Sequence, residues 1–148
     1  MTDNYWDGKN WLTVKKENNI VQYYFNGKKH REDGPAYISY YNDGSIGMEQ
    51  YYVNGLRHRI DGPAQLLFNK NGSIVAKFFV NGIRDNGNEP SVICYDNDGS
   101  SFIKMYYVND KLHRNEGPAI IEYYENEVVE TEYYYINGVK HREDGPAH

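Results

Sequence analysis

The fold of this chain follows from one stretch of its sequence, Tyr51-Tyr52-Val53-Asn54-Gly55-Leu56-Arg57-His58-Arg59-Ile60-Asp61-Gly62-Pro63-Ala64. Its aromatic doublet recurs at spacings of 28, 27, 28 and 28 residues, as Tyr23-Tyr24, Tyr51-Tyr52, Phe78-Phe79, Tyr106-Tyr107 and Tyr134-Tyr135. A fixed period in this range is typical of repeat proteins, in which a single unit cannot bury its apolar face alone. The spacing predicts about 4.5 repeats of 28 residues.

The pair Asn54-Gly55 predicts a β-hairpin, because a type I′ turn needs positive φ at both central residues. In a two-residue loop Val53 faces Leu56 and Tyr52 faces Arg57. The same register sets Tyr51 against His58 and Gln50 against Arg59. The more apolar face is expected to point inward; it carries Tyr51, Val53, Leu56 and His58, and the outward face carries Gln50, Tyr52, Arg57 and Arg59.

A second hairpin is predicted in each repeat, at Asn42-Asp43-Gly44-Ser45 and its equivalents. The strand that enters it alternates apolar and polar residues, as in Ala36, Ile38 and Tyr40, which indicates a half-buried antiparallel strand. No stretch shows a helical period. We therefore expect an all-β protein, an elongated antiparallel meander of hairpins forming a single domain over 1–148. Both tryptophans, Trp6 and Trp11, precede the first repeat, so residues 1–19 are expected to cap repeats that span 20–148.

Composition limits the classes of function. The net charge is −5, and residues 85–148 carry 13 acidic against 5 basic residues. The acidic stretch 122–132 is either a solvated strand face or a surface that docks a basic partner. Nucleic-acid binding is not expected, because phosphate contacts need clustered Lys and Arg. One cysteine, Cys94, and the absence of a leader or long apolar run predict a cytoplasmic protein without a membrane span.

One recurring motif, His-Arg-x-Asp or Glu, contains residue types used in catalysis and metal binding. Its members are His30, Arg31, Asp33, His58, Arg59, Asp61, His113, Arg114, Glu116, His141, Arg142 and Asp144. Strand spacing puts successive histidines roughly 10 Å apart, too far to share a zinc ion. We therefore expect a structural motif, in which each His packs on its cross-strand Tyr and the acid accepts from backbone N–H groups or the neighbouring Arg. No catalytic residue, metal or cofactor is predicted.

Two features are candidates for binding. The second aromatic of each doublet is expected on the outward face beside a basic residue, a composition typical of binding surfaces. These candidates are Tyr24, Tyr52, Arg57, Phe79, Arg84, Tyr107, Tyr135 and Lys140. The third repeat replaces the His-Arg motif with a loop containing Asp85, Asn86 and Asn88. That change is either neutral drift in a tolerant loop or a contact remodelled for a partner.

The Tyr, Asn-Gly and Gly spacing over about residues 20–148 resembles the MORN repeat family, especially its divergent, antitoxin-like branch. The stretch from Tyr51 to Ala64 also resembles repeats of phage and large-DNA-virus proteins. The family resemblance implies β-hairpin ladders, self-association and scaffolding or membrane-apposed roles. A phage-type relative would imply that the protein binds and blocks a host factor.

Three hypotheses of function remain open. The first is a non-enzymatic protein-binding module that inhibits or organises one partner. The second is a protein that sequesters a small anion or nucleotide between repeats, using His and Arg. The third is a self-associating scaffold, including a homodimer formed through a terminal strand edge.

Overall fold

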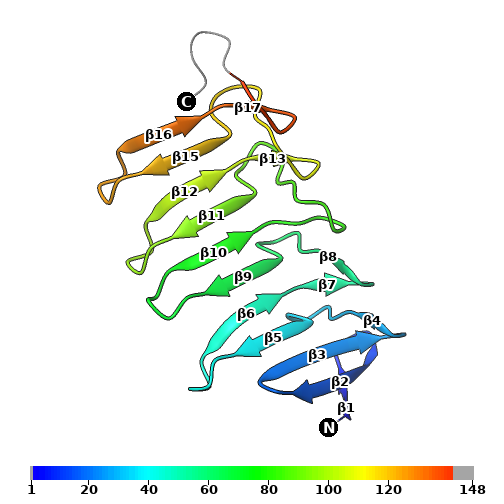
Figure 1. Cartoon of the computed structure of the whole chain (residues 1–148). Helices are drawn as coiled ribbons and strands as arrows, with labels where there is room; N and C mark the ends of the chain where they lie inside the picture. Colours follow the sequence, from blue (N-terminus) through cyan, green and yellow to red (C-terminus); the bar gives the residue numbers. More distant parts are fainter. Residues whose placement is uncertain (1, 142–148) are drawn as a thin grey trace.

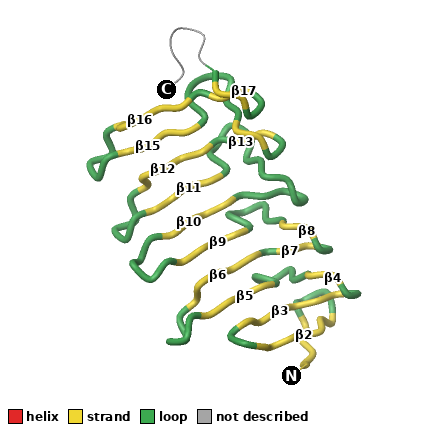
Figure 2. The backbone as a smooth tube through the Cα atoms, viewed as in Figure 1, coloured by secondary structure: helices red, strands yellow, loops and turns green. Residues whose placement is uncertain are grey.

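The structure, a computed structural model that describes residues 2–141, contains antiparallel strands and turns and no helix in that range (Figures 1 and 2). Its strands are β1 (Thr2–Trp6), β2 (Trp11–Glu17), β3 (Ile20–Phe25), β4 (Lys28–Lys29), β5 (Tyr37–Tyr40), β6 (Ile46–Gln50), β7 (Tyr52–Val53), β8 (Leu56–Arg57), β9 (Gln65–Phe68), β10 (Ile74–Lys77), β11 (Val92–Tyr95), β12 (Ser101–Met105), β13 (Tyr107–Val108), β14 (Lys111–Leu112), β15 (Ile120–Tyr123), β16 (Val129–Tyr133), β17 (Tyr135–Ile136) and β18 (Val139–Lys140). The expectation of an all-β antiparallel meander is confirmed.

One long sheet runs the length of the molecule, in the order β1-β2-β3-β5-β6-β9-β10-β11-β12-β15-β16. The short pairs β7–β8, β13–β14 and β17–β18 project from one side of this sheet, and the turns between its longer strands line the opposite side (Figure 1). We call the five segments that begin at each aromatic doublet units 1 to 5. Each unit contributes one Asn-Gly or Asn-Asp turn on the first side.

Turn chemistry explains why the long strands reverse where they do. At the turn between β5 and β6 a side-chain oxygen of Asp43 accepts the backbone N–H of Ser45, two residues later, at 3.0 Å. Asn71, Asp98 and Asn126 make the same contact with Ser73, Ser100 and Val128. This Asx-type contact favours a local turn over continued strand.

The single 27-residue spacing has a structural cause. The pairs β5–β6, β11–β12 and β15–β16 each contain a β-bulge, whereas β9–β10 pairs without one. In β5–β6, Ser39 pairs with Met48 and Tyr40 with Ile46, so Gly47 is the extra residue. A bulge adds one residue to one strand, and the unit that lacks it is one residue shorter.

The short hairpins of successive units are joined directly by backbone hydrogen bonds. The Gly55 N–H donates to the Lys29 carbonyl at 2.8 Å, and the Arg31 N–H donates to the Tyr52 carbonyl at 3.1 Å. Equivalent bonds join the later units, including one from the Arg59 N–H to the Phe79 carbonyl. The expected pairing of Gln50 with Arg59 is therefore wrong, because the Arg59 backbone pairs with the next unit and not with its own hairpin.

The expected assignment of inward and outward faces is also wrong. Leu56, predicted to be inside, is 50% exposed, whereas Gln50 and Phe79, predicted to be outside, are each 7% exposed. Gln50 pairs with Tyr37 and Gln65 in the middle of the long sheet. Gln50 is buried as part of the long sheet, whereas Leu56 belongs to the separate pair β7–β8, so a single alternation of faces does not run through both.

Small residues fill the corner where each loop enters the sheet. Ala36, Ala64, Ser91 and Ala119 are fully buried, and their carbonyls accept the N–H of the first aromatic residue of the same unit, as Ala64 does from Tyr51 at 2.8 Å. At the N-terminal end β2 pairs with β3, and Leu12 and Val14 are buried. Trp6 and Trp11 pack on each other at 5.5 Å between ring centroids and remain exposed.

No helix within residues 2–141 has the length and apolar character to span a membrane.

Deleting Gly47 is expected to lower the free energy of unfolding by less than about 1 kcal/mol, because Ile46 and Met48 can then pair with Tyr40 and Ser39 without a bulge, as in β9–β10. Deleting Val75 removes one residue from a strand that has no bulge, so the side chains on one side of the deletion turn to the opposite face of the sheet. This deletion should lower the free energy of unfolding by more than about 2 kcal/mol. Urea denaturation of the two variants measures the difference. Equal losses would contradict the bulge explanation.

Candidate functional site

The histidine of each His-Arg motif connects one unit to the next. Nδ1 of His30 accepts the N–H of Asn54 at 3.1 Å, and Nδ1 of His58 accepts that of Asn81 at 3.2 Å. His113 makes the same bond to Asn137 at 3.0 Å. In each case the histidine ring accepts a hydrogen bond from the turn of the following unit.

The arginine of the motif stacks on the first aromatic residue of its own unit. The guanidinium carbon lies 4.3 Å from the Tyr23 centroid for Arg31, 4.0 Å from Tyr51 for Arg59 and 3.8 Å from Tyr106 for Arg114. Each arginine also donates to the proline carbonyl four residues later, at 3.5, 3.4 and 3.3 Å. The side chain that stacks on the first aromatic ring is therefore Arg and not the expected His. The backbone pairing of Tyr51 with His58 occurs as predicted.

The third loop keeps the bond to the turn asparagine and the bond to the proline carbonyl with different residues. Asp85 stands in the position of His, and its Oδ2 accepts the N–H of Asn109 at 3.3 Å. Asn86 stands in the position of Arg and donates to the Pro90 carbonyl at 3.0 Å. Asn88 lines a cavity with the His113–Glu116 segment. Asp85 and Asn86 thus have a structural role that accounts for them, and a partner-binding role for this loop remains a prediction.

The acidic residues of the motif do not share one role. Asp33 accepts from Nε of Arg31 at 2.7 Å, as expected. Asp33 and Asp61 line one surface cavity of about 390 Å³, and Glu116 lines another of about 470 Å³. His141 is exposed, and Arg142 and Asp144 lie outside the described residues. Within residues 2–141 no group of three or more His, Cys, Asp or Glu side chains could hold a metal ion.

The second aromatic residues and their basic neighbours form an alternating row, which we call the ladder: Lys29, Tyr52, Arg57, Phe79, Arg84 and Tyr107. The Lys29 Nζ lies 5.4 Å from the Tyr52 centroid, and the Arg57 guanidinium carbon lies 6.0 Å from Tyr52 and 5.3 Å from Phe79. Arg84 lies 3.7 Å from Tyr107. Each cation therefore reaches the ring of the next unit, so the predicted aromatic and basic residues do come together, but as a half-buried stack rather than an exposed surface.

The ladder changes at both ends. Tyr24 is covered by Lys15, at 5.0 Å. In unit 4 the basic position holds Leu112, which pairs with Tyr107. In unit 5 Lys140 pairs with Tyr135 in the backbone but lies over the ring of Tyr133, at 5.3 Å. The continuous row of cations therefore consists of Lys29, Arg57 and Arg84.

A row of aliphatic side chains lies on the opposite face of the short hairpins. Leu56 and Ile83 follow the turn glycine in units 2 and 3 and are 50% and 43% exposed, Val80 is 43% exposed, and Ile60 in the adjoining loop is 79% exposed. We call these four residues the aliphatic row. A Cβ at Gly82 would lie 3.3 Å from the Leu56 side chain, so Leu56 reaches across to the next unit.

Sequence reasoning missed the aliphatic row, although a signal was present. The residue after each turn is Lys28, Leu56, Ile83, Lys111 or Val139. Lys28 and Lys111 adjoin the turn glycines Gly55 and Gly138, as Leu56 adjoins Gly82. Lysine occupies the same exposed position in units 1 and 4, so packing within the chain does not require an apolar residue there.

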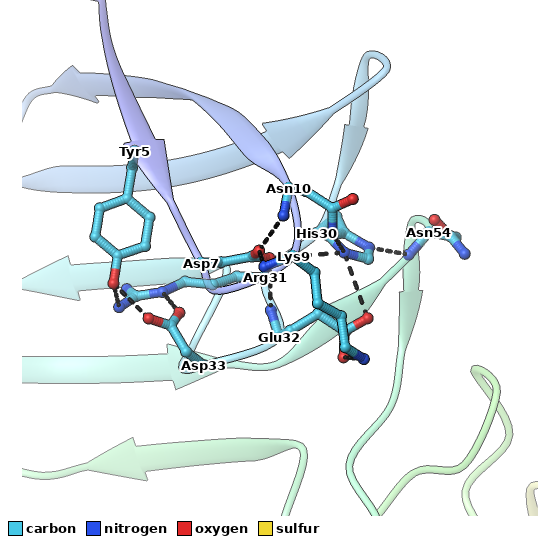
Figure 3. A network of polar contacts seen from close by, with 9 residues as sticks. All are labelled: Tyr5, Asp7, Lys9, Asn10, His30, Arg31, Glu32, Asp33 and Asn54. Atoms are coloured by element: carbon cyan, nitrogen blue, oxygen red, sulfur yellow. Dashed lines mark hydrogen bonds and ion pairs between the residues drawn. The ribbon is translucent and has the colours of Figure 1, made fainter.

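The N-terminal segment is joined to unit 1 by a polar network (Figure 3). Asp7 is buried, and its carboxylate accepts the N–H groups of Asn10, Lys9 and Glu32 at 2.7, 3.0 and 3.1 Å. The Tyr5 hydroxyl donates to Asp33 and accepts from Arg31. Burial acts to raise the pKa of Asp7, but the three backbone hydrogen bonds outweigh burial and hold this pKa below its ordinary value.

Exchanging His58 for Asp tests the histidine link, since the chain itself uses Asp85 in that position. His58→Ala leaves the Asn81 N–H without its acceptor and should cost about 1 kcal/mol in the free energy of unfolding. His58→Asp should recover most of that loss. The measurement is chemical denaturation near neutral pH, and a His58→Asp variant no more stable than His58→Ala would contradict the assigned role.

Asp7→Asn is expected to lower the free energy of unfolding by about 1–3 kcal/mol at pH 7, because the charged acceptor of three buried hydrogen bonds is lost. The folded-state pKa lies below the ordinary carboxyl value, so the contribution of Asp7 is present above about pH 4 and is lost as the pH falls through the lowered value. The two proteins should therefore converge in stability in acid. A constant difference from pH 7 down to pH 2 would argue against this origin.

No protein-family model matches this chain, and the search of curated proteins gave no match. The resemblance to MORN-like repeats therefore remains a prediction from the sequence. What the chain does has to be argued from the ladder, the aliphatic row and the cavities beside them.

Proposed function

We propose that this chain is a non-enzymatic protein-binding module whose contact surface is the aliphatic row. The observation that supports it is the exposure of Leu56, Ile60, Val80 and Ile83 on adjacent units. Large aliphatic side chains that gather on one side of a folded surface are typical of protein interfaces. The hydrogen bonds between successive hairpins hold this row in a fixed arrangement, which lowers the entropic cost of binding.

Charged residues at both ends of the aliphatic row also fit a protein partner. Lys28 and Lys111 take the places of Leu56 and Ile83 in the flanking units. An apolar centre with a charged rim is the usual anatomy of an interface, in which the rim selects the partner. Inhibition of a host factor is the form of this function that the resemblance to phage and virus repeats favours.

The alternative of sequestering a small anion or nucleotide has weaker support. Two cavities contain Arg and His, one with Arg31, His58 and Arg59 and the other with His113 and Arg114. Their arginines already stack on tyrosine rings and donate to proline carbonyls. Carboxylates line both cavities, and a carboxylate opposes an anion.

The test is a variant in which the aliphatic row carries residues that other units already hold in the same positions. Leu56→Lys and Ile83→Lys copy Lys28 and Lys111, and Ile60→Glu copies Glu32. The triple variant should therefore keep its thermal unfolding temperature. Protein captured from an extract of the native host, identified by mass spectrometry, should fall at least about tenfold.

The matched control is Ile46→Lys. Ile46 is exposed at the start of β6, beside the turns on the opposite side of the sheet, and its replacement adds the same net charge as the triple variant. Capture by the control should equal that of the unaltered protein. Unchanged capture by the triple variant would remove the aliphatic row as the contact surface.

A further inference from the structure

The arginines of this protein fall into two classes. Arg31, Arg59 and Arg114 donate hydrogen bonds to carbonyls within the chain. The Arg57 side chain makes no hydrogen bond or ion pair with any residue in 2–141. Arg84 makes an ion pair with Asp110, in which Nε lies 3.9 Å from the carboxylate, beyond hydrogen-bonding distance. In both, Nε is buried without an acceptor.

Arg57 and Arg84 are nevertheless held in place. Arg57 lies between the rings of Tyr52 and Phe79, and Arg84 lies against Tyr107. Neither residue is fully buried, and the Arg84 side chain is 26% exposed. A guanidinium fixed on aromatic rings keeps its planar donor fork for carboxylate recognition without a large loss of side-chain entropy.

The spacing of the cations along the ladder defines the geometry of a ligand. Lys29 and Arg57 are separated by two hydrogen-bonded strand steps, from β4 to β7 and from β7 to β8. Two steps amount to about 9.6 Å. A polyproline II helix repeats every three residues, over about 9.3 Å, and returns the same side to a surface each time. An extended β-strand would present opposite sides at that spacing.

We propose that Lys29, Arg57 and Arg84 form a site for an acidic segment of a partner protein, bound in the polyproline II conformation with a carboxylate at every third residue. The inference rests on the proposed function, because it names the chemistry of a protein partner. The site lies on the face of the short hairpins opposite the aliphatic row, since Arg57 pairs with Tyr52 and Leu56 with Val53. The two surfaces can therefore be tested separately.

A peptide is favoured over a single-stranded nucleic acid for two reasons. Nucleic acids bind such rows by stacking bases on free aromatic rings, and the rings of Tyr52, Phe79 and Tyr107 already have cations over them. The chain carries a net charge of −5, which disfavours a long polyanion. A short acidic segment needs only three local cations.

The experiment measures fluorescence anisotropy of a labelled peptide containing three Glu-Pro-Pro triplets. We expect saturable binding that weakens as the salt concentration rises from about 50 to about 500 mM. Arg57→Gln should weaken binding at least about tenfold, as expected for loss of a charge-assisted contact. The control Lys70→Gln, which removes one exposed positive charge at a turn on the opposite side of the sheet, should leave affinity unchanged.

A variant that should gain peptide affinity provides a second test. Leu112 interrupts the row before Lys140, so Leu112→Arg should join Lys140 to it. That variant should bind a peptide of five Glu-Pro-Pro triplets at least about tenfold more tightly than the unaltered protein does, with a smaller change for three triplets. Equal affinities for the long peptide would count against the row.

Four further results would overturn the proposal: no saturable binding at millimolar peptide, equal binding by Arg57→Gln, equal binding of three Glu-Gly-Gly triplets that lack the polyproline II bias, or tighter Arg57-dependent binding of oligothymidylate. Because a defined peptide is used, failure here leaves the host-extract capture result standing. If the aliphatic-row variant loses capture but still binds the peptide, the aliphatic row and the peptide site are independent surfaces.

Discussion

The structure depends on the backbone geometry of one asparagine in each unit. Asn26, Asn54, Asn81, Asn109 and Asn137 all adopt φ near 50°, in the left-handed region, which asparagine accepts at lower cost than most residues. In units 2 to 5 the N–H of this asparagine donates to the His or Asp of the preceding unit. The next residue donates its own N–H to a carbonyl of that unit. A tight turn therefore also serves as the joint between units.

Much of the fold could be predicted from the sequence, because strand period and turn chemistry are local. Short-range rules predict the Asn54-Gly55 turn and the pairing of Tyr52 with Arg57, as well as the absence of helix from residues 2–141. The faces could not be predicted, because the long sheet ends at Gln50 and the short hairpin that follows belongs to a separate sheet. Counting apolar residues on each side favoured Leu56 over Gln50, and the structure reverses that order.

The candidate sites were predicted less well than the fold, for a related reason. Sequence reasoning placed Tyr52 and Arg57 together correctly but looked for contacts within one hairpin. The contacts that decide the roles of Arg57, His58 and Arg59 instead reach the next unit or the following loop. The aliphatic row was missed because Leu56 was assigned to the inward face, whereas it is half exposed.

The single-layer sheet has a consequence for how the molecule opens. Each unit contacts chiefly the units before and after it, so stability is close to a sum of unit and interface terms. Opening a hairpin in the middle breaks two interfaces, and opening one at an end breaks one. Backbone amides around β9–β11 should therefore exchange with solvent most slowly. Since Leu56, Arg57 and Ile83 lie beside that slow region, both candidate surfaces are placed on the part of the chain that opens least often.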